Sequence, residues 1–145
     1  MKKAIVITLV LAMVGVAQAG TLLVSDIAGG DIRMYDSTTG APQGLLCDVT
    51  AQGLTSPREI AVGSDGNLYV NVTQGIARYN ATSGAYVDLW AASRHYTMTL
   101  DPTTNTVYTA SPGAPYDVMQ IAAGVESLYH TMVSPTITAR VDHSM

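Results

Sequence analysis

The stretch Ser56-Pro-Arg-Glu-Ile-Ala-Val-Gly-Ser-Asp-Gly-Asn-Leu-Tyr-Val70 decides the fold of this chain. It predicts two short strands, 60–62 and 68–70, because aliphatic, β-branched and tyrosine side chains suit a pleated surface. The Gly-Ser-Asp-Gly-Asn segment between them predicts a tight turn, since these residues adopt turn conformations at little steric cost. Weaker copies of the same pattern occur before and after this stretch, which indicates a repeat.

Outside this stretch, the chain from Thr21 onward alternates short apolar runs with clusters of Gly, Pro, Asn, Asp and Ser. No run has the i, i+3, i+4, i+7 spacing of an extended helix, so an all-β fold is predicted. The further strands are expected at 22–25, 32–35, 45–50, 76–79, 86–91, 95–100, 107–110, 118–122 and 128–133.

The repeat has a period near 40 residues. Tyr35-Asp-Ser-Thr-Thr-Gly40 is repeated as Tyr79-Asn-Ala-Thr-Ser-Gly84 after 44 residues, and Leu22-Leu-Val24 as Leu68-Tyr-Val70 after 46. Tyr69 and Tyr108 are 39 residues apart. The segments 56–62 and 134–141 are 78 residues apart, or twice 39. A unit of about 40 residues with four short strands is typical of a β-propeller blade.

The segments 56–62, 65–70 and 78–84 resemble blades of a broad group of propellers. This group includes NHL-repeat proteins, the SMP-30/gluconolactonase-like enzymes and the streptogramin (virginiamycin B) lyases. The resemblance covers roughly residues 22 to 141 and is clearest in 22–88. It implies a partial β-propeller of four-stranded antiparallel blades, with about 12 strands, and it implies no particular activity, because blade motifs encode turns and core rather than a site.

The expected blade segments are 22–53, 56–91, 93–133 and the start of a further blade at 134–145. They amount to about three blades, whereas a closed propeller typically has about four to eight. Three outcomes follow: a dimer that completes a six-bladed ring, a shortened coding sequence, or an open stack with unprotected edges. In the dimer, strand 137–141 of each chain completes the first blade of the other.

The N-terminal residues 1–19 predict a signal-peptide helix, with 20–145 as the mature domain. Lys2 and Lys3 precede an apolar run at 4–17, and Ala17-Gln-Ala19 has the small residues of a cleavage site. The run of 14 residues is shorter than the roughly 20 needed to cross the hydrocarbon core, so no stable membrane insertion is expected after cleavage. A secreted or periplasmic location is predicted.

Charge and cysteine content exclude several classes of function. After cleavage, five of the seven basic residues remain against eleven acidic residues, a formal charge of −6. This charge argues against binding to nucleic acid, which requires clustered basic residues. Cys47 is the only cysteine, so an intrachain disulfide is impossible. It is expected as a small apolar residue in a strand, and the alternative is a thiol that links two chains.

The chemically active residue types suggest no reaction. His95, His130 and His143 are not at a metal-ligand spacing and are expected as strand or surface histidines. Resemblance to the streptogramin lyases implies a histidine acid or base, but no histidine here matches that motif. Asp26, Asp31 and Asp65 are weak candidates for a calcium site. Turn chemistry is the favoured interpretation, since aspartate in turns commonly bonds to its own backbone.

These observations favour an exported, non-catalytic binding or scaffold module, with no catalytic or cofactor-binding residue assigned. Its ligand is expected to be a protein or a carbohydrate. The alternative is a subunit of a lactonase-like or lyase-like propeller enzyme whose site forms only on assembly.

Overall fold

The computed structural model describes residues 20–110 and 117–131. These residues form eleven strands and confirm the predicted all-β class. The elements are β1 (Thr21–Asp26), β2 (Asp31–Asp36), β3 (Pro42–Asp48), the short 3-10 helix η1 (Thr50–Gln52), β4 (Ile60–Val62), β5 (Asn67–Val72), β6 (Gly75–Asn80), β7 (Tyr86–Ala91), β8 (Met98–Asp101), β9 (Thr106–Ala110), β10 (Asp117–Ala122) and β11 (Val125–Thr131).

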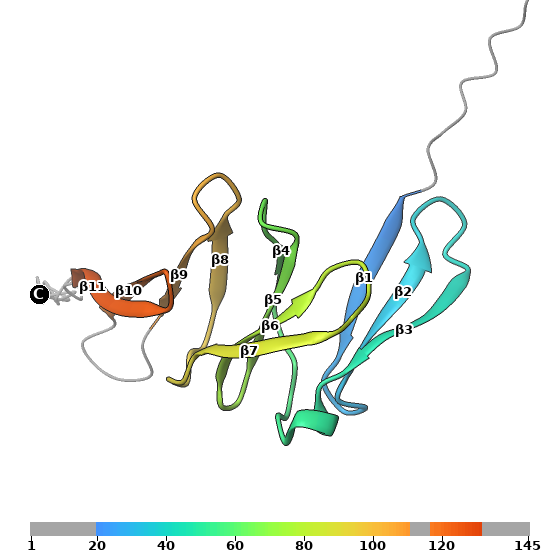
Figure 1. Ribbon diagram of the computed structural model, residues 1–145, viewed down its shortest axis with the longest axis horizontal. Helices are drawn as coiled ribbons and strands as arrows, with labels where there is room; N and C mark the ends of the chain where they lie inside the picture. The colour runs from blue at the N-terminus through green and yellow to red at the C-terminus, as the bar shows by residue number, and fades with distance from the viewer. Residues whose placement is uncertain (1–19, 111–116, 132–145) are drawn as a thin grey trace, which may run out of the picture.

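The strands build three antiparallel sheets, in the orders β1-β2-β3, β4-β5-β6-β7 and β8-β9-β10-β11. The sheets lie side by side in sequence order (Figure 1). Within each sheet, each strand pairs with the next along the chain, as short hairpin connections require. The predicted signal-peptide helix at 1–19 and the predicted strand at 137–141 lie outside the described residues.

Several strand boundaries differ from the sequence-based expectation, including the start of β3 at Pro42 rather than at residue 45. Strand β3 ends at Asp48 because the Asp48 carboxylate accepts hydrogen bonds from the Thr50 amide and hydroxyl, at 2.8 and 2.6 Å, where η1 begins. Strand β8 begins only at Met98 rather than at residue 95. Strand β11 begins at Val125 because Ala123 and Gly124 have positive φ of 49° and 77°, which closes a tight hairpin.

The first and second sheets repeat each other in backbone detail. The β2–β3 pairing shifts register between Ile32 and Arg33 and again between Met34 and Tyr35. The β6–β7 pairing shifts at the equivalent places, 44 residues later, between 76 and 77 and between 78 and 79. The sequence period therefore corresponds to a structural period that includes the irregularities of the ladder.

The turns after β2 and β6 are also copies of each other. The Asp36 side chain accepts hydrogen bonds from the Thr38 and Thr39 amides, and the Asn80 side chain accepts the matching pair from residues 82 and 83. Gly40 and Gly84, which close the two turns, both have φ of 70°. Asp and Asn can hold this turn equally because each offers a side-chain oxygen to two backbone amides.

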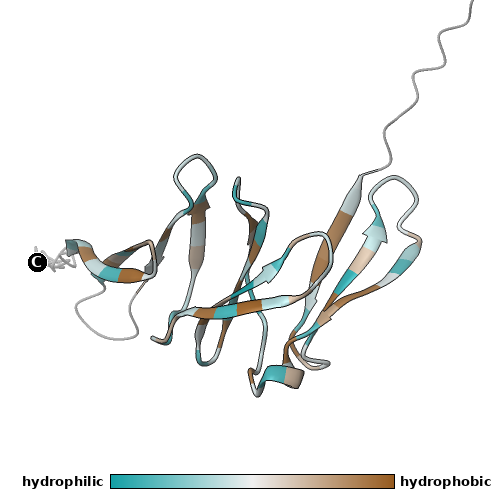
Figure 2. Cartoon of the chain, in the orientation of Figure 1, coloured by the Kyte–Doolittle hydropathy of each residue, from teal (hydrophilic) through white to brown (hydrophobic). Residues whose placement is uncertain are grey.

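Two apolar clusters hold the three sheets together. Apolar segments occur along the strands of all three sheets (Figure 2). The cluster between the first and second sheets contains Ile32, Leu46, Cys47, Val49, Leu54, Leu68, Val70, Val72, Ala77 and Tyr79. The cluster between the second and third sheets contains Tyr69, Ile76, Ala91, Met98, Val107 and Ile121. The second sheet therefore buries both of its faces.

Two glycines allow the sheets to approach closely. Gly84, in the turn after β6, lies against the backbone carbonyl of Leu46 on β3, so closely that a Cβ atom at this position would overlap it. A Cβ atom on Gly124, in the turn after β10, would lie 3.1 Å from the carbonyl oxygen of Trp90 on β7. Each turn thus packs on the last strand of the preceding sheet.

We predict that Gly84→Ala destabilises the fold more than Gly66→Ala. Both glycines have positive φ, 70° and 77°, so each alanine incurs about 1–2 kcal/mol of left-handed strain. Only Gly84 is also crowded by backbone, which adds a further ~1–3 kcal/mol, whereas a Cβ atom on Gly66 meets no atom within 4 Å. Urea unfolding of both variants measures the difference, and equal losses would contradict the close packing at Gly84.

Candidate functional site

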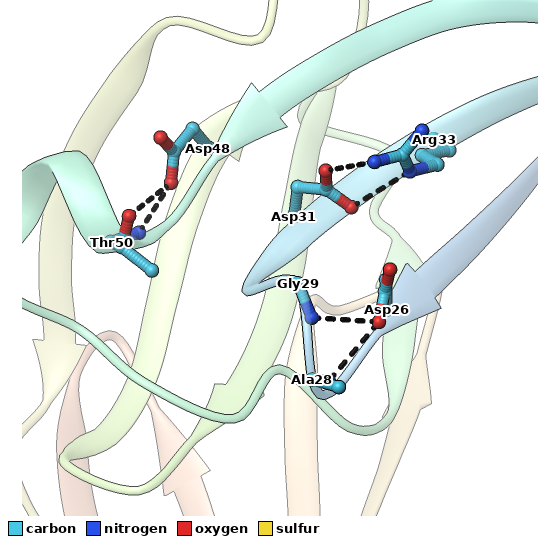
Figure 3. Close-up of polar contacts among 7 residues, drawn as sticks. All are labelled: Asp26, Ala28, Gly29, Asp31, Arg33, Asp48 and Thr50. Carbon is cyan, nitrogen blue, oxygen red and sulfur yellow. Dashed lines mark hydrogen bonds and ion pairs between the residues drawn. The ribbon is translucent and has the colours of Figure 1, made fainter.

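The three acidic residues that are candidate calcium ligands bond within their own local structure. Figure 3 shows Asp26 accepting hydrogen bonds from the amides of Ala28 and Gly29, at 3.1 and 2.8 Å. Asp31 forms an ion pair of 2.8 Å with Arg33. Asp26 and Asp31 are register partners at one end of the first sheet.

Asp65 lies in the second sheet, in the turn between β4 and β5. Its carboxylate accepts hydrogen bonds from the Asn67 side-chain amide at 2.7 Å and from the Tyr69 hydroxyl at 3.0 Å. Burial alone would raise the pKa of Asp65, but these hydrogen bonds outweigh it and lower the pKa. Residues 20–110 and 117–131 contain no group of three or more His, Cys, Asp or Glu side chains arranged to hold a metal ion.

Sequence reasoning placed His95 in a strand or on the surface, and this is wrong. His95 precedes β8, its side chain is only 2% exposed, and neither ring nitrogen has a hydrogen-bond partner. It occupies the position of buried Pro57 in the preceding sheet. The next residue in each case, Tyr96 or Arg58, donates its backbone amide to a carbonyl at the matching place. The repeat period in the sequence, which aligns His95 with Pro57, was the signal that could have predicted the burial of His95.

The other two histidines do not join His95 in the described structure. His130 is exposed on β11, and His143 lies outside the described residues. Burial lowers the pKa of His95, against the opposing charge of Glu126. A lone neutral imidazole without a nucleophile or orienting partner is best explained as a core residue.

His95 is predicted to make the fold sensitive to mild acid. Its pKa lies below the ordinary value of 6.5, so the unfolded chain binds the proton more readily than the folded chain. The contribution of neutral His95 to the free energy of unfolding is therefore fully present well above pH 6.5. It is lost as the pH falls below 6.5, by at most ~1.4 kcal/mol per pH unit. Urea unfolding between about pH 7.5 and pH 5.5 should show this loss in the wild type and in His130→Leu, but not in His95→Leu.

Cys47 lies on β3 and is 6% exposed within the first apolar cluster, as expected of a small apolar strand residue. Burial, reinforced by the charges of Asp31 and Asp48, raises the pKa of its thiol to about 11. The thiolate, which is the reactive form, is therefore scarce at neutral pH.

We expect a thiol-reactive dye to label Cys47 at least about a hundredfold more slowly in the folded chain than in urea, because two pKa units reduce the thiolate fraction by that factor. The rate of dye release at pH 7 measures it. Fast labelling of the folded chain would show that the thiol is accessible and would revive the alternative of a cross-link between chains.

The first sheet exposes an apolar face on the side away from the second sheet. We call this the outer face of the first sheet, and it consists of Leu22, Val24, Arg33, Tyr35 and Leu45. Leu22, Val24 and Leu45 are 52%, 40% and 55% exposed. An open hollow of about 610 Å³ on this side is lined by Val24, Ser25, Asp26, Ile27, Ala28, Arg33 and Tyr35.

Three of these five side chains have buried equivalents of the same type in the second sheet, whereas Arg33 stands where the second sheet has Ala77. Leu22 and Tyr35 are register partners on β1 and β2, as their equivalents Leu68 and Tyr79 are on β5 and β6. Leu68 and Tyr79 are 0% and 1% exposed, because the first sheet covers them. Apart from Arg33, the outer face of the first sheet thus repeats side chains of a face that the second sheet packs against the first.

Strand β1 also has an open edge. It pairs with β2 alone in the described part of the chain, while the second and third sheets each have a further strand, β4 or β8, at the equivalent edge. An unpaired edge presents backbone amides and carbonyls that can accept another strand. The open face and the open edge therefore meet at β1.

Comparison with models of known protein families found no match for this chain. A search of curated proteins found no relative either. Among the helices of the described residues, none is long and apolar enough to span a membrane. The candidate site therefore depends on the geometry alone, which is an exposed apolar face and an open strand edge that meet at β1.

Proposed function

We propose that this chain is an exported, non-catalytic binding or scaffold module, built of β-propeller-type blades, that docks a protein on the outer face of its first sheet. One observation carries the proposal: Leu22 is 52% exposed where its equivalent Leu68 is 0% exposed. A contiguous apolar patch on a surface marks an interaction site. Leu22, Val24 and Tyr35 in this patch stand where the second sheet has the buried Leu68, Val70 and Tyr79.

The assignment of the sheets as blades draws on their repetition. Each sheet follows the period of the sequence, and neighbouring sheets pack through the faces that the two apolar clusters join. The first sheet has one strand fewer than the other two in the described residues, and residues 134–141 resemble 56–62, the segment that contains β4. The shared register shifts of the first two sheets support a common blade plan.

The chemistry of the outer face favours a protein over a carbohydrate. Its exposed side chains are mainly aliphatic, and its one cation, Arg33, is engaged by Asp31. Sugars require several polar groups that converge on hydroxyls, whereas aliphatic and tyrosine side chains suit a protein partner. Export follows from the predicted signal at 1–19 and places the module in the periplasm or outside the cell.

The enzyme alternative requires a site that two chains build together. A lactonase-like assembly of this kind predicts one divalent metal ion, such as calcium, bound to the assembled protein. Elemental analysis of the exported protein after dialysis distinguishes the two functions. A stoichiometric metal favours the enzyme, and its absence from an intact assembly favours the scaffold.

We predict that a photoreactive amino acid at position 22 of the exported chain cross-links to a protein in its own host. The same amino acid at position 87, where Val87 on β7 is 46% exposed, is the matched control and should give little cross-linking. Mass spectrometry of the product identifies the partner. If neither position cross-links, or if both do so equally, the outer face is not a docking surface and the proposed function fails.

A further inference from the structure

The contacts between sheets follow one plan that occurs twice within the chain. Gly84, in the turn after β6, lies against the backbone of Leu46 on β3. Gly124, in the turn after β10, lies against the backbone and indole of Trp90 on β7. Leu46 and Trp90 are 44 residues apart, one period of the repeat. In each case a turn glycine packs on the last strand of the preceding sheet.

Each of these contacts has two parts, a turn with its glycine and the strand that receives it. The first sheet has such a turn, at Gly40, that packs on no strand in the described part of the chain. Gly40 closes a turn with the same hydrogen bonds and the same φ of 70° as the turn of Gly84. A Cβ atom on Gly40 would meet no atom within 4 Å, whereas one on Gly84 would overlap Leu46. The turn is therefore shaped for a close backbone contact that the described part of the chain does not supply.

The receiving half lies at the other end of the stack, on the third sheet, where no residue of 20–110 or 117–131 packs on it as the third sheet packs on the second. Tyr69 and Trp90, on the face of the second sheet that receives Gly124, form an edge-to-face pair at 5.2 Å. Tyr108 and Tyr129 lie 39 residues later and form the same kind of pair at 5.0 Å. Tyr69 is 1% exposed and its equivalent Tyr108 is half-buried, while Trp90 is half-buried and its equivalent Tyr129 is 60% exposed. A hollow of about 200 Å³ on this side is lined in part by Tyr108 and Val118.

We infer that the outer face of the first sheet of one copy packs on the outer face of the third sheet of a second copy, with the Gly40 turn against the backbone of Tyr129. The inference rests on the proposed docking function and names the partner as this same chain. The interface joins two different faces, so it is head to tail, and two copies joined through two such contacts close a ring of six sheets.

The apolar character of both faces supports a second copy as the occupant. Leu22, Val24 and Leu45 stand on one face, and Tyr108, Val118 and Tyr129 stand on the other. The two contacts within the chain already join faces of these two types. The second sheet packs the face equivalent to the outer face of the first sheet on the first sheet, and the face equivalent to the outer face of the third sheet on the third. The dimer therefore forms between two chains the same sheet-to-sheet contact that already occurs twice within one chain.

The substitution Gly40→Asn tests the interface, because asparagine tolerates positive φ and adds a side chain only where the second copy would lie. We expect the wild type to be a dimer by size-exclusion chromatography with light scattering. Gly40→Asn should raise the dimer dissociation constant at least ~100-fold, since it overpacks both contacts. The matched control is Gly53→Asn, at φ 72° with no atom within 4 Å, which should leave the constant unchanged.

Thermal unfolding of each variant separates loss of dimer from loss of fold. Gly40→Asn and Gly53→Asn should lose equal and small amounts of monomer stability. A wild type that is monomeric at every concentration overturns the inference, and so does a Gly40→Asn variant that dimerises as tightly as the wild type.

A mixing experiment tests the head-to-tail arrangement. Tyr129→Arg should be monomeric alone, because a charged side chain would be buried in the contact. A mixture of Gly40→Asn and Tyr129→Arg keeps one contact that is wild type on both sides, so a heterodimer should appear. A mixture without any heterodimer overturns this arrangement.

The cross-linking at position 22 separates this inference from the function beneath it. A product of two copies of this chain supports both. A product with a different protein, together with a monomeric wild type, overturns the self-assembly and leaves the docking function standing. No product at position 22 overturns both.

Discussion

Each sheet of this chain depends on a neighbour to bury its apolar side chains. The first sheet turns Ile32 and Leu46 toward the second, and the second turns Tyr69 and Ile76 toward the third. A single sheet cannot bury its own apolar face, so stacking on a neighbour is what stabilises it. The turn glycines at 84 and 124 permit this stacking because they let one backbone rest on another.

The same dependence explains why the ends of the stack matter. An internal sheet buries both faces, but an end sheet keeps one face that was built for burial. On the first sheet, that face lies beside the open edge of β1, so the unmet packing and the unmet backbone hydrogen bonds coincide. Repeat proteins usually cover such ends with polar capping units. The described residues have Leu22 and Val24 there instead, which is the physical basis of the docking proposal.

Several acidic residues fix the turns in which they lie. Asp36, Asp48 and Asp101 each accept hydrogen bonds from amides or hydroxyls in their own turns, and these bonds lower the pKa of each carboxyl. A carboxylate used in this way fixes a turn. These three carboxylates therefore serve local backbone geometry.

The sequence by itself determined the all-β class, eleven of the strands and the period of about 40 residues. It could do so because alternation and turn residues act over a few positions, where local chemistry decides. It also indicated the turn roles of Asp26 and Asp65 and the buried character of Cys47.

Only the tertiary structure decided which sheet face is covered. Leu22 and Leu68 have the same side chain and the same place in the repeat, and they differ only in whether another sheet lies against them. The burial of His95 was not predicted for the same reason. It comes from packing at the position that Pro57 has in the preceding repeat, and not from the neighbours of His95 in the chain. The stretch 56–70 thus defines the repeating unit, while the candidate site arises where the stacking of units stops.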